Sequence, residues 1–149
     1  MRILVFVLLT AAAVSAQEGP PPGRPPLRER AAKGDVEAQY RLAMNYEAGR
    51  SGLKKDYAQA AHWYRMAAEQ GDPYAQAGLG LLYRFGKGVD RDLVQAYLWL
   101  DLAVNHTTGP ESDSIKEYRD AAGAKMSQQQ IADAVKLERE WKPKPSEQK

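Results

Sequence analysis

The amino-acid sequence predicts an all-α fold in which antiparallel helix pairs stack into a short α-solenoid. Two observations predict this class. A pattern of residues in 34–49 recurs 37 positions later in 71–86, and a pattern in 52–67 recurs 36 positions later in 88–103. Apolar and small residues within each unit fall three and four positions apart, which is helical spacing and not strand spacing. We expect a repeat domain at 29–141, with clear units at about 30–66 and 67–103 and a degenerate capping pair at 109–141.

The matching positions define two helices in each unit. The first helices carry Ala38, Leu42 and Tyr46, then Ala75, Leu79 and Tyr83, and the second helices carry Ala60, Trp63 and Ala67, then Ala96, Trp99 and Ala103. An aspartate stands where the N-cap of each helix accepts a backbone N–H. These four aspartates are Asp35, Asp56, Asp72 and Asp92. Gly49 and Gly86 are placed to end the first helices in the left-handed conformation.

The change of offset falls in one loop, where residues 49–52 correspond to 86–88. A deletion confined to a turn leaves the packed helix faces untouched, as a structural repeat requires. Ala43 and Gly80 share one register position in the first helices. Because their side chains are small, the partner helix can approach closely, and we expect a bulky substitution there to separate the pair.

The third unit keeps only part of the pattern. Pro110 stands 37 residues after Pro73, and residues 114–117 and 127–130 resemble two capping boxes, but the Leu, Tyr and glycine-loop positions are lost. A terminal repeat must present one side to solvent, so loss of the pattern is expected in a cap.

The two ends of the chain differ from the repeats. Residues 1–16 read as a secretory signal peptide, because an apolar run follows Arg2 and ends in a small-residue cleavage pattern. Residues 17–28 are proline-rich and predict a stiff linker. Residues 142–149 are polar with two prolines and predict a disordered tail. We therefore expect a periplasmic or secreted protein with no membrane span after cleavage; without cleavage, the apolar run would anchor it.

Composition argues against several kinds of site. The chain has 21 Lys and Arg against 19 Asp and Glu, with no long run of either sign, so we expect no nucleic-acid partner. It has no cysteine, and its two histidines, His62 and His106, lie in different units. Clustered ligands or catalytic groups are therefore missing from the sequence. We expect no metal, no cofactor and no enzymatic activity.

A stripe on the first helices is the candidate partner-binding surface, because its members are spaced three and four apart and mix apolar with charged side chains. Its residues are Glu37, Tyr40, Met44 and Glu47 in one unit and Tyr74, Ala77, Leu81 and Arg84 in the next. The alternative is that the third unit and the linker cover these residues.

The repeat resembles the Sel-one-like repeat family. The resemblance rests on the first-helix residues Leu42, Ala43, Tyr46 and Gly49 with Asp56 and Trp63, and on their second-unit counterparts Leu79, Gly80, Tyr83, Gly86, Asp92 and Trp99. It implies a right-handed superhelix with a concave face lined by the first helices, a role as an adaptor, and no cofactor. Tetratricopeptide repeats are the second family by resemblance, since their period is about 34 residues and they lack this glycine loop.

The expected function is an exported, monomeric scaffold that binds a peptide or protein on the concave face. One alternative is a hydrolase acting on cell-wall or β-lactam material. Relatives with cysteine-paired repeats are linked to β-lactam binding, but this chain has no cysteine. An inhibitory module for another exported protein, or a structural component that stacks onto further copies, also fits a repeat surface.

Overall fold

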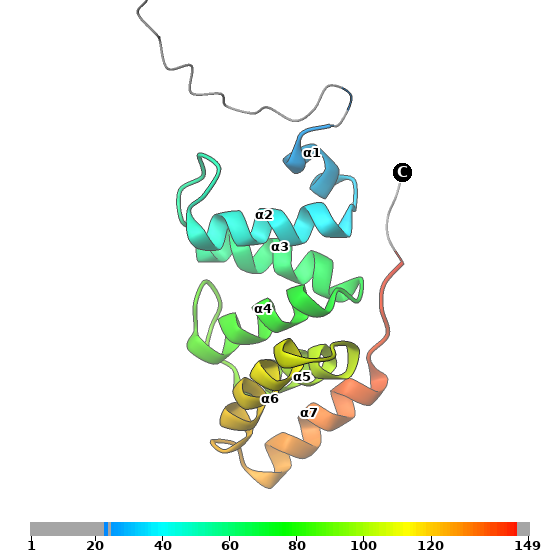
Figure 1. Ribbon diagram of the computed structural model, residues 1–149. Coiled ribbons are helices and arrows are strands. Elements are labelled where there is room, and N and C mark those ends of the chain that lie inside the picture. The colour runs from blue at the N-terminus through cyan, green and yellow to red at the C-terminus, as the bar shows by residue number, and fades with distance from the viewer. Residues whose placement is uncertain (1–22, 24, 146–149) are drawn as a thin grey trace, which may run out of the picture.

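The computed structural model describes residue 23 and residues 25–145, which form seven helices and no strand. The helices are α1 Leu27–Ala32, α2 Val36–Ala48, α3 Tyr57–Glu69, α4 Pro73–Phe85, α5 Leu93–His106, α6 Pro110–Gly123 and α7 Gln128–Glu140. Figure 1 shows them stacked along one direction. The all-α fold is confirmed. The predicted signal peptide, most of the predicted linker and the last four residues lie outside the described part.

The repeating unit is an antiparallel helix pair. α2 packs on α3, α4 packs on α5, and the pairs join where α3 meets α4 (Figure 1). Each predicted N-cap aspartate accepts a backbone N–H at its helix start, at 2.7 to 3.0 Å. Gly49 and Gly86 follow α2 and α4 with φ of 67° and 65°, the left-handed region where glycine is unstrained. Among the described residues, no helix has the length and apolar character needed to cross a membrane.

Small side chains bring the helices close together. Alanines at 0% exposure line every helix contact of the two clear units, and Leu79 and Leu82 of α4 and Leu100 of α5 are the largest apolar side chains at 1% exposure or less. Burial of apolar surface stabilises the stack by roughly 25 cal/mol per Å². These alanines are Ala38, Ala43, Ala60, Ala67, Ala68, Ala75, Ala96 and Ala103.

Helix α1 was not expected from the sequence, since the linker was predicted to run through residue 28. Its end has the same turn as the end of α3: Gly34 N–H donates to Ala31 at 3.1 Å, as Gly71 N–H donates to Ala68 at 3.0 Å. α1 is therefore the last part of a second helix, placed before the first clear unit. The signal was present in the sequence, because the turn at Gly34 and Asp35 matches the one that follows α3.

The C-terminal helices confirm one predicted capping box and contradict the other. Ser127 and Gln130 exchange both hydrogen bonds of the box at the start of α7, at 2.9 and 3.2 Å. Ser114 lies inside α6, because that helix already begins at Pro110, and its hydroxyl donates to the Pro110 carbonyl at 3.3 Å. Proline has a fixed φ suited to the first helical position, so it sets the start of α6 earlier.

The capping pair is arranged differently from the other two pairs. α6 and α7 are both present, but each packs mainly against α5. α6 continues the series of first helices, whereas α7 crosses the stack beside α5 (Figure 1). The third unit thus covers both sides of α5 and closes this end of the core.

The described part of the predicted disordered tail, 142–145, differs from that prediction. Trp141 ends α7 with its ring 6.4 Å from the Trp99 ring, packed against the main core. Beyond it, the Lys144 N–H donates to the Glu69 carbonyl at 2.7 Å and its ammonium pairs with the Glu69 carboxylate at 2.6 Å. The partly buried tryptophan directs the chain along the C-terminal end of α3, where free helix carbonyls accept hydrogen bonds.

Candidate functional site

The predicted stripe places two tyrosines from neighbouring units together. The ring centroids of Tyr40 on α2 and Tyr74 on α4 lie 6.1 Å apart, and Tyr40 also lies 6.0 Å from the ring of Tyr64 on α3. Tyr64 is buried at 4% exposure, Tyr40 is half-buried, and Tyr74 is 50% exposed. The three rings, here called the tyrosine cluster, form an aromatic surface across the joint between the two units.

Tyr64 is the buried member of the cluster, and its position is fixed by a hydrogen bond. Its hydroxyl donates to the Glu47 carboxylate at 2.7 Å. Burial, together with this hydrogen bond and the Glu47 charge, raises the pKa of Tyr64, so the hydroxyl stays protonated and keeps donating. The Tyr64 ring packs directly against Gly78 of α4. A Cβ at that position would lie 2.9 Å from the ring, so only glycine allows this contact. Tyr64 is not among the residues predicted for the site, although it stands next to the repeat residue Trp63 in α3.

The surroundings of the cluster are acidic and partly apolar. Burial, and then the charges of Asp72 and Glu47, raise the pKa of Tyr40. Met44 is 39% exposed on the same helix. Glu37, at the start of α2, forms an ion pair with Arg41 at 3.3 Å. The stripe on α2 is therefore partly accessible, and the carboxylates of Glu47 and Asp72 lie near its aromatic centre.

The α4 residues of the stripe after Tyr74 are partly covered. Ala77 and Leu81 pack against the small core between α5 and α6 that contains Leu100 and Ile115. Arg84 lies over the Tyr118 ring of α6, 5.4 Å from its centroid. The alternative considered from the sequence, that the third unit covers the stripe, thus holds in part for Ala77 and Leu81, whereas Arg84 rests on α6 with its side chain still partly exposed. It does not hold for Tyr40, Met44 and Tyr74.

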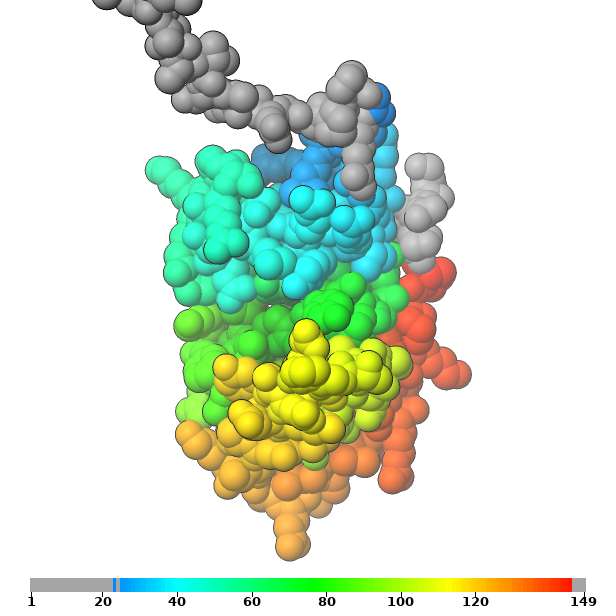
Figure 2. Space-filling model, viewed as in Figure 1, coloured from blue at the N-terminus to red at the C-terminus, as the bar shows by residue number. Residues whose placement is uncertain are grey.

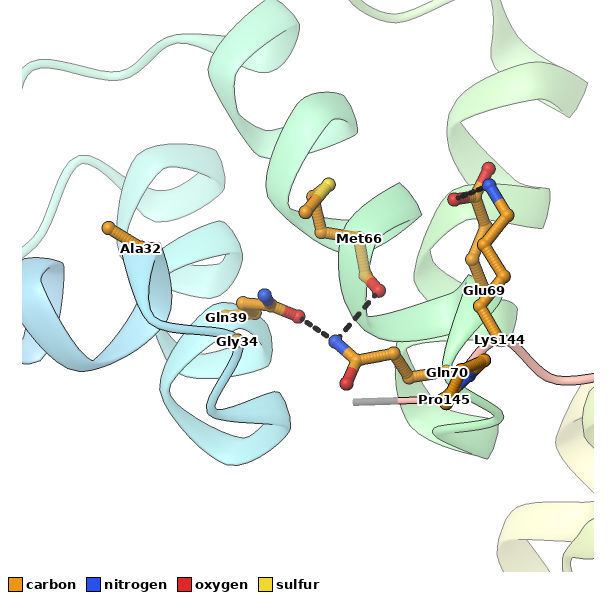
Figure 3. Close-up of a pocket in the computed structure, with 8 residues that line it drawn as sticks. All are labelled: Ala32, Gly34, Gln39, Met66, Glu69, Gln70, Lys144 and Pro145. Carbon is orange, nitrogen blue, oxygen red and sulfur yellow. Dashed lines mark hydrogen bonds and ion pairs between the residues drawn. The ribbon is translucent and has the colours of Figure 1, made fainter. Parts of the chain in front are cut away.

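A cavity of about 280 Å³ lies at the other side of the first unit, between the end of α3 and the C-terminal segment (Figure 3). Its polar groups mostly serve the fold. Gln39 is fully buried; its Nε2 donates to the Ala31 carbonyl at 3.1 Å, and its Oε1 accepts from Gln70 Nε2 at 2.7 Å. In the next unit, Gln76 Nε2 donates in the same way to the Ala68 carbonyl at 3.3 Å. The Ala-Gln motif therefore caps the preceding helix. The lining residues are Ala32, Gly34, Gln39, Met66, Glu69, Gln70, Lys144 and Pro145.

The histidines occupy structural positions. The His62 ring stands edge-on to the Trp63 ring, with centroids 5.0 Å apart. His106 Nδ1 lies 2.7 Å from the Leu102 carbonyl, to which it must donate, because a carbonyl oxygen only accepts. Within the described ranges, no group of three or more His, Cys, Asp or Glu side chains is placed to hold a metal ion.

Antiparallel helix pairs repeated every 36 to 37 residues define a helical-repeat protein, an α-solenoid. Residues 36–72 and 73–106 each match the sequence model of the Sel1 repeat. The chain belongs to the Sel1 repeat family. Proteins built from this repeat are typically non-catalytic scaffolds for protein interaction, which makes a protein-binding repeat module the function class of this fold.

Solved structures agree with this assignment. The structure of a protective antigen present in uropathogenic Escherichia coli strains, which displays the SLR fold, superimposes with a TM-score of 0.69 at 39% identity, over 77% of this chain and 24% of the antigen. A Sel1 repeat protein from Oxalobacter formigenes superimposes with a TM-score of 0.50 at 32% identity, over 77% of this chain and 96% of that protein. Figure 2 shows the stacked helices as a continuous body.

Two curated relatives are much longer than this chain. HRD3A of Arabidopsis thaliana, a component of an ERAD-associated E3 ubiquitin-protein ligase, is 38% identical over 62 residues, or 42% of this chain. The chitin synthase regulator SKT5 of Saccharomyces cerevisiae is 38% identical over 77 residues, or 51% of this chain. The chain spans only 9% and 11% of their respective lengths, so the likeness concerns the repeats themselves.

Proposed function

We propose that this chain is an exported interaction module that binds a peptide or protein across the tyrosine cluster on its first-helix face. The observation that carries the proposal is the 6.1 Å approach of Tyr40 and Tyr74 from separate repeats, with Tyr74 half exposed. Tyrosine is enriched at binding hot spots, because its large ring contributes contact area with little loss of side-chain freedom. The relatives named as a ligase component and a synthase regulator support a role beside other proteins.

The cluster favours a partner segment that combines an apolar and a basic side chain. Met44 and the exposed edge of Tyr74 offer apolar contact area. Glu47 and Asp72 supply the negative charge near Tyr40, and a cation over a tyrosine face is attracted by the ring. Tyr64, fixed by Glu47, packs against Tyr40 from the buried side, so the surface is pre-organised. Little binding free energy is then spent on ordering these side chains when a partner binds.

The first test removes the rings of Tyr40 and Tyr74. The Tyr40→Ala, Tyr74→Ala double variant is expected to bind a captured partner at least about 30-fold more weakly, the loss expected for a truncated hot spot of about 2 kcal/mol. The Tyr40→Phe, Tyr74→Phe variant should retain most of the affinity, since it keeps the rings. Affinity is measured by titration with the purified partner, and helical circular dichroism checks the fold.

Leu137→Ala on α7 is the matched control, because Leu137 is 39% exposed and lies outside the cluster. It should bind as the unchanged protein does. A partner that binds the alanine double variant with unchanged affinity would show that the tyrosine cluster is not the binding surface.

Export is the second part of the proposal, and it rests on the sequence of residues 1–16. When the full chain is produced in a bacterial host with a secretory pathway, intact mass and N-terminal sequencing of the envelope fraction should give a mature chain that starts at Gln17. Ala16→Lys removes the small residue before the cleavage point, so this variant should keep its N-terminal segment. Unprocessed, cytosolic protein from the natural sequence would refute export.

A further inference from the structure

The turns that follow the first helices gather positive charge along one edge of the stack. α2, α4 and α6 run in the same direction, so the turns after them lie along the same side (Figure 1). Five basic residues of this side are spread over 71 positions of the sequence, from 55 to 125. We call them the basic edge: Lys55, Arg84, Lys87, Arg91 and Lys125.

Aromatic rings link three of these cations, Lys55, Lys87 and Arg84, in one row. The ammonium groups of Lys55 and Lys87 lie 5.0 and 5.2 Å from the centroid of the Tyr57 ring. Lys55 and Lys87 belong to the loops of different units, so this ring connects the two loops. Lys87 also lies 5.7 Å from the Phe85 ring. The Arg84 guanidinium continues the row, 4.8 Å from Phe85. The pKa of the Tyr57 hydroxyl is lowered, first by its hydrogen bond with Lys55 and also by both positive charges, so the local field is positive.

The row ends in a cleft of about 270 Å³ between α4, the start of α5 and the turn before α7. Three of its five lining residues are cationic and none is acidic. Arg91 is fixed toward Arg84, because its Nε donates to the Arg84 carbonyl at 3.2 Å. The lining residues are Arg84, Phe85, Arg91, Leu93 and Lys125. Arg84, predicted as part of the partner-binding stripe, therefore belongs to this cleft.

The cations of the basic edge are not in ion pairs within the described part of the chain. Asp56, Asp90 and Asp92 stand in the same turns, and Asp56 and Asp92 accept backbone N–H groups as helix caps, at 3.0 Å each. Like charges held close together repel, and a bound anionic group relieves that repulsion.

We propose that the basic edge binds an acidic segment of a partner protein, with its carboxylates in the cleft of Arg84, Arg91 and Lys125 and an apolar side chain against Phe85. Arginine forms paired hydrogen bonds with carboxylates, and the 54% exposed Phe85 ring provides the apolar contact. The cleft admits a few side chains and not a duplex, so a peptide suits it better than a nucleic acid. This site is separate from the tyrosine cluster and does not depend on it.

The test uses the full chain and a fluorescent peptide that alternates glutamate with phenylalanine. The peptide should bind, and its affinity should fall as salt is raised, because exposed charge pairs are screened. Arg91→Glu with Lys125→Glu should weaken binding at least about 10-fold, and Arg91→Gln with Lys125→Gln should weaken it less. Lys136→Glu with Arg139→Glu on α7 makes the same charge change elsewhere and should alter affinity less than about twofold.

Several results would overturn the proposal: no binding of the glutamate peptide, equal binding of its glutamine counterpart, or equal losses in the edge variant and the α7 variant. Tighter binding to single-stranded DNA or to vesicles containing anionic lipid would instead assign the edge to those ligands. The Tyr40→Ala, Tyr74→Ala variant should bind the acidic peptide normally. Failure of the tyrosine-cluster proposal and failure of this one are therefore distinguishable.

Discussion

Replacing Gly88 with alanine is expected to lower the free energy of unfolding by more than about 3 kcal/mol, at the upper end of single-substitution effects. Gly88 has φ of 68°, and a Cβ there would overlap the carbonyl group of Tyr57 and lie 2.5 Å from Ala58 N. Both obstacles are backbone atoms at the start of α3, so no side-chain rotation relieves them. The loop of the second unit would have to move away from the first unit.

Gly52 offers a matched control, because it occupies the same register position in the first unit. It has φ of 75°, but a Cβ there meets nothing within 4 Å. Gly52→Ala should therefore lower the free energy of unfolding by only about 1 kcal/mol, the strain of a non-glycine residue in the left-handed conformation. Urea unfolding followed by circular dichroism measures both variants. Equal losses would mean that packing between the units contributes nothing at Gly88.

Shortening Leu100 to alanine is expected to cost about 3 kcal/mol, because it removes a fully buried side chain between α4 and α6. Gly80 on α4 faces it: a Cβ at Gly80 would lie 2.8 Å from Leu100 Cγ and 3.2 Å from the Ala96 carbonyl oxygen. Gly80→Ala alone should therefore destabilise by about 1 to 2 kcal/mol through overpacking, despite the gain in helix propensity of about 1 kcal/mol.

The effect of Gly80→Ala should change sign in the Leu100→Ala background. With Leu100 shortened, the new methyl group has space and partly fills the cavity, so the propensity gain remains and the double variant should be more stable than Leu100→Ala alone. Combining Gly80→Ala with Leu42→Ala is the control, since Leu42 belongs to a separate core cluster and the two costs should add. A strictly additive result for Gly80 and Leu100 would contradict the close approach.

The prediction of the candidate site from the sequence was only partly complete. Helical spacing grouped Tyr40 with Met44 on one face of α2 and aligned Tyr74 with Glu37 in the next repeat, since those relations hold within one helix or between repeats. Spacing along one helix did not give the contact between Tyr40 on α2 and Tyr64 on the neighbouring helix α3, so Tyr64 was missed. It also could not separate Tyr74 from Leu81, because which of them α6 covers depends on how the third unit packs.

The ends of the repeat domain were less predictable than its middle. The turn at Gly34 carried a repeat signal, but the six-residue α1 is too short for a periodic pattern to define. Pro110 set the start of α6 more strongly than the apparent capping box four residues later. The segment after Trp141 has a polar composition typical of disorder, and its order comes from contacts with α3, 75 residues away in sequence.

The sequence by itself determined the repeat, its helix pairs, the aspartate caps and the glycine turns, because each of these depends on residues within a few positions of one another. The tertiary structure decided which faces stay exposed, where the C-terminal segment lies, and how dispersed lysines and arginines form one basic edge. The physical reason is that burial and electrostatic fields depend on distances in space. Those distances join residues from different units, and local spacing along the chain does not contain them.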